Sequence, residues 1–250
     1  MRFPLVLLLL LAARLAIAQE PAVKPSTPAP EPRLQRQTPS AGLIAVIGYN
    51  DAVNERDVLT QAVPELLRFI RESTELTAPL TWARMPLYDA RVPQAVMLYL
   101  TGADAQMRLD EVERRALGDF LRGGGLVFAE DLMGGNGTPF VGQLKALVRD
   151  PLVLGSQGTQ WQPIPNDHPL YSCFFDMPGG PPLTGAAGER FTRGLEGLEY
   201  HGRLAVIYSN LGLSYHWWTD AAGRESSLRL GTNLLVQALS NRRAGIPLRR

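Results

Sequence analysis

The chain has 250 residues, 45% of them apolar and 20% charged, which is the balance of a globular protein with one large domain or two small ones. This composition excludes collagen, a coiled coil and disorder throughout the chain. The net charge is +1 and the basic residues are scattered, so no basic block is available for nucleic-acid phosphates, and we expect no nucleic-acid partner.

Residues 1–18 have the organisation of a secretory signal peptide, with a basic start, an apolar run over residues 5–13 and small residues up to Ala18. The apolar run is too short to cross a bilayer. We therefore expect cleavage after Ala18, a periplasmic or secreted protein, and no stable membrane span after cleavage. An uncleaved anchor is the alternative. Cleavage would also remove Arg2 and Arg14, which leaves 23 basic and 24 acidic side chains and no electrostatic reason for membrane adhesion.

Residues 19–41 are rich in proline and polar residues and predict an extended, disordered tether. A proline-rich ligand for a partner protein is the alternative for this segment. We expect residues 42–243 to form a single α/β domain and residues 244–250 to be a C-terminal tail.

Four short apolar runs predict strands whose two faces are both covered, because none of them alternates apolar with polar residues. They lie at 43–47, 95–100, 126–129 and 204–208. Amphipathic patterns predict helices at 64–73, 109–122 and 225–240, with Pro64 at a first helical position. Residues 151–199 are rich in Gly and Pro and predict loops and irregular edge structure. The expected fold is a three-layer sandwich with a mostly parallel central sheet.

Polar residues and a glycine follow the predicted strands, where open α/β sheets bind their ligands. If the strands are parallel, one crevice is lined by Asn50, Gly102, Asp104, Glu130, Asp131 and Asn210. The alternative is that these side chains cap the following helices and turns.

A second polar cluster, Asp167-His168, is held between prolines. We count both residues among the candidate ligand-binding side chains and expect no cofactor. The alternative is a divalent metal held by Asp131, Asp167 and His168, although the sequence has no established metal-ligand spacing. Residues 215–218, Tyr-His-Trp-Trp, either fill the core or form a stacking surface for a sugar or a partner.

Nucleophilic catalysis has little support, because a nucleophile elbow needs Ser or Cys between small residues at a strand end. The third predicted strand leaves through Glu130-Asp131 instead. The single cysteine, Cys173, lies between aromatic residues, and we expect it to be buried as a small apolar side chain.

Several runs resemble the family called domain of unknown function 4159. They are Leu98–Gly102, Gly123–Asp131, Pro165–Tyr171, Gly202–Asn210 and Arg229–Asn233. The resemblance covers residues 43–242 and implies a fold like the class I glutamine amidotransferases, which is flavodoxin-like. Because Glu130-Asp131 stand near the position of the amidotransferase cysteine, glutaminase activity should be absent. Some members of the family carry membrane spans, whereas this chain shows only an export signal.

The leading hypothesis is a non-catalytic, exported domain that binds a ligand or a protein partner in the cell envelope. The first alternative is a metal-assisted hydrolase acting on an envelope sugar or peptide, in which Asp131 and His168 hold the ion and Glu130 activates water. The second alternative is a purely structural domain that the tether lets reach a partner.

Overall fold

The computed structural model describes most of the chain from Gly42 onward. The described residues are 42–48, 57–75, 79–102, 107–132, 139–156, 159–182, 194–219 and 222–244. The predicted signal peptide and tether lie outside them, as do the candidate site residues Asn50 and Asp104.

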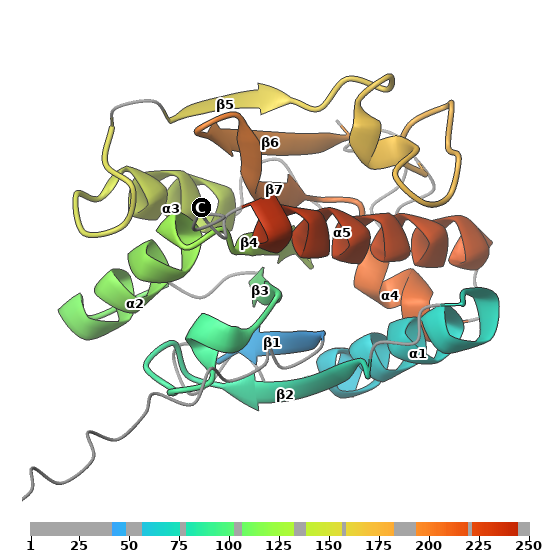
Figure 1. The fold of residues 1–250 in the computed structure, drawn as a ribbon, viewed down its shortest axis with the longest axis horizontal. Helices are drawn as coiled ribbons and strands as arrows, with labels where there is room; N and C mark the ends of the chain where they lie inside the picture. The colour runs from blue at the N-terminus through green and yellow to red at the C-terminus, as the bar shows by residue number, and fades with distance from the viewer. Residues whose placement is uncertain are drawn as a thin grey trace, which may run out of the picture. The chain divides into compact units, whose positions relative to one another are not determined.

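Within these ranges, seven strands form one sheet in the order β2-β1-β3-β4-β7-β6-β5 (Figure 1). They are β1 (Leu43–Ile47), β2 (Thr81–Met85), β3 (Met97–Gly102), β4 (Leu126–Asp131), β5 (Gln160–Pro163), β6 (Leu195–Tyr200) and β7 (Arg203–Ser209). The neighbouring strands from β2 to β7 pair in parallel, whereas the pairs β7–β6 and β6–β5 are antiparallel. The four apolar runs therefore lie in parallel strands, as predicted, and the structure shows that these strands are adjacent.

Helices cover both faces of this sheet. They are α1 (Asp57–Ser73), α2 (Glu111–Arg122), α3 (Pro139–Arg149), α4 (Leu213–Trp218) and α5 (Arg224–Ala244), with 3-10 turns η1 (Val92–Gln94) and η2 (Pro169–Tyr171). Side chains of α1, α4 and α5 share one buried cluster with one face of the strands, and those of α2 and α3 share another with the opposite face (Figure 1). This arrangement is compatible with the predicted three-layer sandwich.

Helix α2 ends at Arg122, as predicted, and begins at Glu111, two residues after the predicted start. Asp110 accepts a hydrogen bond from the Glu113 amide, and the Glu113 carboxylate accepts one from the Asp110 amide, which forms a capping box. Gly124 follows the helix with a φ of 90°, a conformation that glycine adopts without strain. The expectation for Pro64 is wrong: helix α1 begins at Asp57 and continues through Pro64.

The segment 151–199 is more regular than predicted, because it contains β5, η2 and β6. Strand β5 forms one edge of the sheet and its residues are mostly exposed, so it lacks the apolar run that marks a covered strand. Helix α3 was also not predicted, although Phe140, Leu144 and Val148 place one buried stripe on it.

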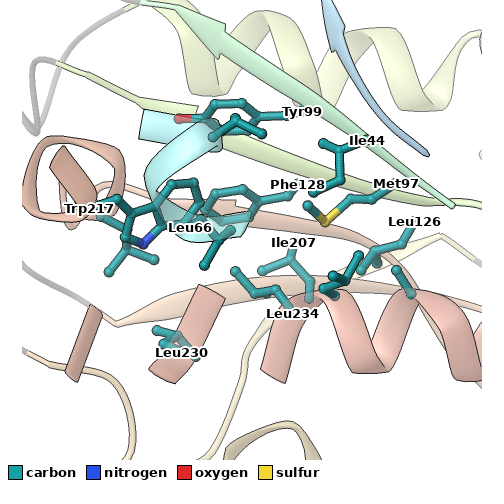
Figure 2. Close-up of a cluster of buried hydrophobic side chains, with 14 of the residues drawn as sticks. Ile44, Leu66, Met97, Tyr99, Leu126, Phe128, Ile207, Trp217, Leu230 and Leu234 are labelled. Carbon is teal, nitrogen blue, oxygen red and sulfur yellow. The ribbon is translucent and has the colours of Figure 1, made fainter. Parts of the chain in front are cut away.

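Trp217 of α4 belongs to the first buried cluster (Figure 2). Its ring centroid is 5.9 Å from that of Tyr99 and 6.1 Å from that of Phe128, and its Nε1 donates a hydrogen bond to the Ser227 carbonyl at 2.9 Å. Of the two interpretations of the aromatic run 215–218, core packing is thus correct for Trp217, whereas Tyr215 is exposed.

Candidate functional site

The structure brings four predicted site residues together at the carboxyl edge of the parallel strands. Gly102 at the end of β3 is paired with Asp131 at the end of β4, and Glu130 is paired with Ser209 of β7. Asn210 comes directly after that serine and is buried. The strand register therefore places Gly102, Glu130, Asp131 and Asn210 side by side, although the two carboxylates are fully buried rather than open to a crevice.

The Glu130 carboxylate is occupied by hydrogen bonds from the protein. It accepts one from the Tyr99 hydroxyl at 2.8 Å, one from the Ser214 amide at 3.2 Å and one from the Leu213 amide. Burial raises the pKa of this carboxyl, and the hydrogen bonds from Ser214, Tyr99 and Leu213 oppose that shift.

These contacts make Glu130 the cap of helix α4. The residue before that helix is Gly212, which has a φ of 65° and no side chain to accept the first amides. The amides of Leu213 and Ser214 have no intrahelical acceptor, and the buried carboxylate from β4 supplies one. The capping alternative considered for the strand-end carboxylates therefore describes Glu130.

Asp131 is equally buried and interacts with Tyr208 of β7. Burial raises the pKa of the Tyr208 hydroxyl, and the charge and hydrogen bond of Asp131 raise it further. The Asp131 carboxylate is therefore also engaged within the fold.

Asp167 and His168 lie at the same edge of the sheet but two strands away from β7. They follow β5, and the Ile164 amide donates to the Leu195 carbonyl at 2.8 Å at the start of β6. Asp167 is exposed, whereas His168 is partly buried and its Nδ1 accepts a hydrogen bond from the Leu170 amide at 3.0 Å. Burial lowers the pKa of His168, and the nearby charges of Glu199 and Asp167 oppose this shift, so we treat the imidazole as neutral near pH 7.

A cavity of about 350 Å³ opens beside His168, and its wall is formed by the segment after β5. The lining residues are Asn166, Asp167, His168, Tyr171, Ser172, Asp176, Met177 and Pro178. Tyr171 is only 2% exposed, and its hydroxyl has no hydrogen-bond partner among the described residues. An adjoining cavity of about 400 Å³ shares Asp176 and Met177 and extends to Ser226 and Arg229 of α5.

Helix α5 fixes the wall segment that the two cavities share. The Asn233 amide group donates to the Phe175 carbonyl at 2.9 Å, and its oxygen accepts from the Phe175 amide at 2.8 Å. The Met177 amide also donates to the Tyr171 carbonyl at 2.8 Å. These bonds hold the backbone of residues 171–177 in place before any ligand is bound.

Cys173 lies in this wall and corrects one expectation, because the residue is exposed rather than buried. Its Sγ is nevertheless turned toward the protein and contacts the Leu170 carbonyl at 3.6 Å and the Asn233 carbonyl at 3.3 Å. Removal of the sulfur from water raises the pKa of the thiol to about 11, which leaves little thiolate for nucleophilic attack at neutral pH.

The structure does not bring Asp131, Asp167 and His168 together as a metal site. Across the described ranges, no three His, Cys, Asp or Glu side chains are placed so that they could hold one ion. None of the described helices is long and apolar enough to span a bilayer.

The sequence reasoning selected two residues of the first cavity, Asp167 and His168, but missed Tyr171, Asp176 and Arg229. Tyr171 and Arg229 both lie in runs that carried the resemblance to a known family. That resemblance was the only signal that could have pointed to them, because neither residue type nor spacing sets them apart.

Comparison with protein families gives a match that spans the strand edge and both cavities. Residues 43–239 match the sequence profile of Domain of unknown function (DUF4159). The chain belongs to the DUF4159 family. The predicted membership is therefore confirmed. No curated protein matches the chain.

Within this DUF4159 domain, the run Arg229–Asn233 has several distinct roles. Arg229 lines the second cavity, Leu230 is fully buried in the core, and Asn233 holds the wall at Phe175. Gly231 lies where a Cβ would come within 2.7 Å of the Leu66 side chain, so the helix packs closely at this point.

Proposed function

We propose that this DUF4159 chain is an exported, non-catalytic domain of the cell envelope that binds a small polar ligand in the cavity beside His168. The observation that carries the proposal is this preformed cavity, whose wall is bonded to α5 through Asn233 and Phe175. Its volume lies in the range of ligand pockets. Most of its lining side chains are polar, which suits a polar ligand.

The strand edge supports a non-catalytic role. Glu130 and Asp131 are buried and engaged within the fold, so neither presents a free carboxylate at the end of β4. We further propose that the fold is like that of the class I glutamine amidotransferases with the nucleophile lost, because this strand end carries the pair Glu130-Asp131. The metal-assisted hydrolase has less support, since the Glu130 oxygens that would activate water accept backbone amides instead.

Export is supported by the organisation of residues 1–18, and we propose cleavage after Ala18 and a periplasmic or secreted location. The tether at residues 19–41 would then separate the domain from the envelope component that it serves. Mass spectrometry of the chain recovered from the periplasm of an expressing bacterium tests this part. An N-terminus at Gln19 is expected, and a chain retained in the cytoplasm with Met1 intact would contradict it.

Ligand binding is tested by thermal unfolding of the full chain with a panel of sugars, amino acids, short peptides, muropeptides, divalent metals and chelator. A ligand at 100 times its Kd stabilises the folded state by about 2.7 kcal/mol. We expect one class of ligand to stabilise the wild type but not His168→Asn. Asparagine is chosen because its side chain can still cap η2. The matched control is His201→Asn, at an exposed turn residue with a φ of 51° that Asn tolerates.

No stabilisation by any member of the panel would contradict the binding function. Turnover of a sugar or peptide together with stabilisation by metal would favour the hydrolase instead.

A further inference from the structure

The two cavities adjoin, and their charged side chains differ. Asp176 and Met177 line both, so the two cavities lie next to each other. The cavity beside His168 carries the carboxylates of Asp167 and Asp176, whereas the second cavity extends to Arg229. Among the described lining residues, Arg229 is the only Lys or Arg.

The Asp176 carboxylate is available to a ligand. Asp176 is exposed and makes no hydrogen bond or ion pair with any other described residue, although the bonds of Asn233 fix the neighbouring backbone at Phe175. A solvated carboxylate beside a cavity attracts an ammonium group through charge-assisted hydrogen bonds.

Arg229 is held in place but keeps hydrogen-bonding capacity. Its guanidinium carbon lies 5.4 Å from the ring centroid of Phe175, and its Nη2 is 2.6 Å from the Glu225 carboxylate. Glu225 is 70% exposed, so this ion pair competes weakly with a ligand. A guanidinium has five N–H donors, and no other side-chain bond of Arg229 is formed within the described residues. The remaining donors can take a carboxylate in a bidentate pair.

Resting on the proposed binding function, we propose that the two cavities together bind a zwitterionic ligand, a short peptide with both termini free. Its ammonium group lies at Asp176 with Asp167 nearby, and its carboxylate lies at Arg229. The backbone between the termini passes Met177, Pro178 and Pro182, whose apolar surfaces suit the methylene and methyl groups of small side chains. A neutral sugar carries no charged group to pair with either of these side chains.

The experiment measures binding of alanine peptides of two to four residues to the full chain by isothermal titration calorimetry. Each length is used with free termini, with an acetylated N-terminus and with an amidated C-terminus. We expect the free peptide of the fitting length to bind, and each cap to weaken binding at least tenfold. In Asp176→Asn, the free and the acetylated peptide should bind equally, whereas amidation should still weaken binding. In Arg229→Gln, the free and the amidated peptide should bind equally, whereas acetylation should still weaken binding.

Two variants serve as controls. Arg115→Gln on α2 removes an arginine in the same i,i+4 pairing with a glutamate, Glu111, and Asp119→Asn removes an exposed carboxylate on that helix. Both should bind every peptide as the wild type does. Equal binding of free and capped peptides, or equal weakening of all peptides in Arg229→Gln, would overturn the zwitterionic ligand.

The outcomes separate this inference from the proposed function. If no peptide binds but a sugar stabilises the wild type and not His168→Asn, the binding function stands and the peptide inference is wrong. If neither peptides nor any other small molecule binds, both are wrong.

Discussion

Asn233 of α5 and Phe175 in the cavity wall exchange two hydrogen bonds, at 2.8 and 2.9 Å, across 58 residues of sequence. The asparagine is fully buried, and its side-chain oxygen and nitrogen both find their hydrogen-bond partners in the backbone of Phe175. This pair connects the helix that packs on the sheet to the loop that carries Asp176. The shape of the cavities therefore depends on one side chain in the family-matching run at residues 229–233.

Replacement of Asn233 by Ala should loosen the wall and lower the free energy of unfolding by about 1–3 kcal/mol, because the Phe175 amide and carbonyl lose their partners. Cys173 reports the local effect, since its Sγ contacts the Asn233 carbonyl. We expect a thiol reagent to label Cys173 faster in Asn233→Ala under native conditions. The control is Asn241→Ala, which removes another buried asparagine of α5, one that donates to the Leu204 carbonyl of β7. Equal labelling rates in the two variants would contradict the local role of Asn233.

Glu130 should behave as a structural cap rather than as a catalytic base. Glu130→Ala leaves the amides of Leu213 and Ser214 and the Tyr99 hydroxyl without an acceptor, and we expect a loss of roughly 3 kcal/mol in unfolding free energy. Glu130→Gln keeps one oxygen acceptor for the helix and should cost less. Urea unfolding of the two variants measures both values, and an Ala variant as stable as the wild type would exclude the capping role.

The same residue predicts a pH dependence. Burial raises the pKa of the Glu130 carboxyl in the fold above its ordinary 4.5, so protonation favours the folded state. The stabilisation is fully present below the unfolded pKa and is lost as pH rises through the folded pKa. The wild type should therefore lose stability relative to Glu130→Gln as pH increases above about 4.5. Urea unfolding at several pH values checks this, and parallel stability profiles for the two proteins would contradict it.

The sequence predicts the central strands of the sheet because a strand that is buried on both faces has a continuous apolar run. Strands β1, β3, β4 and β7 are covered on both faces, and each contains an uninterrupted apolar run. In β4 the charged pair at the end of the strand is buried as well. Strands β2 and β5 carry exposed polar residues at the two edges of the sheet, where pairing with a neighbour rather than composition makes them strands.

The candidate site was predicted less well, for a physical reason. Parallel strands do place Gly102, Glu130, Asp131 and Asn210 at one edge, as expected. The sequence cannot show that α4 would dock there and take the Glu130 carboxylate, because that contact joins residues more than eighty positions apart. The cavity wall likewise depends on the distant pair Phe175 and Asn233.

Two helical glycines should respond to alanine in opposite directions. At Gly118 of α2 a Cβ would overlap the Leu152 carbonyl and lie 2.8 Å from the Val153 carbonyl, so Gly118→Ala should destabilise the fold by about 1–3 kcal/mol. At Gly142 of α3 a Cβ meets nothing within 4 Å, and Gly142→Ala should stabilise it by about 0.5–1 kcal/mol. Urea unfolding measures both, and a Gly118→Ala variant at least as stable as the wild type would refute the close packing at Gly118.

Two buried tyrosines provide a matched test of the cavity. The Tyr99 hydroxyl donates to Glu130, so Tyr99→Phe should destabilise the fold by about 1–3 kcal/mol. The Tyr171 hydroxyl has no partner among the described residues, so Tyr171→Phe removes a buried polar group and should leave the unfolding free energy unchanged or slightly higher. If a bound ligand takes that hydroxyl, Tyr171→Phe should weaken binding while Tyr99→Phe does not. Urea unfolding and calorimetric titration of both variants measure the two effects, and a Tyr171→Phe variant as destabilised as Tyr99→Phe would mean that the hydroxyl is already satisfied in the free protein.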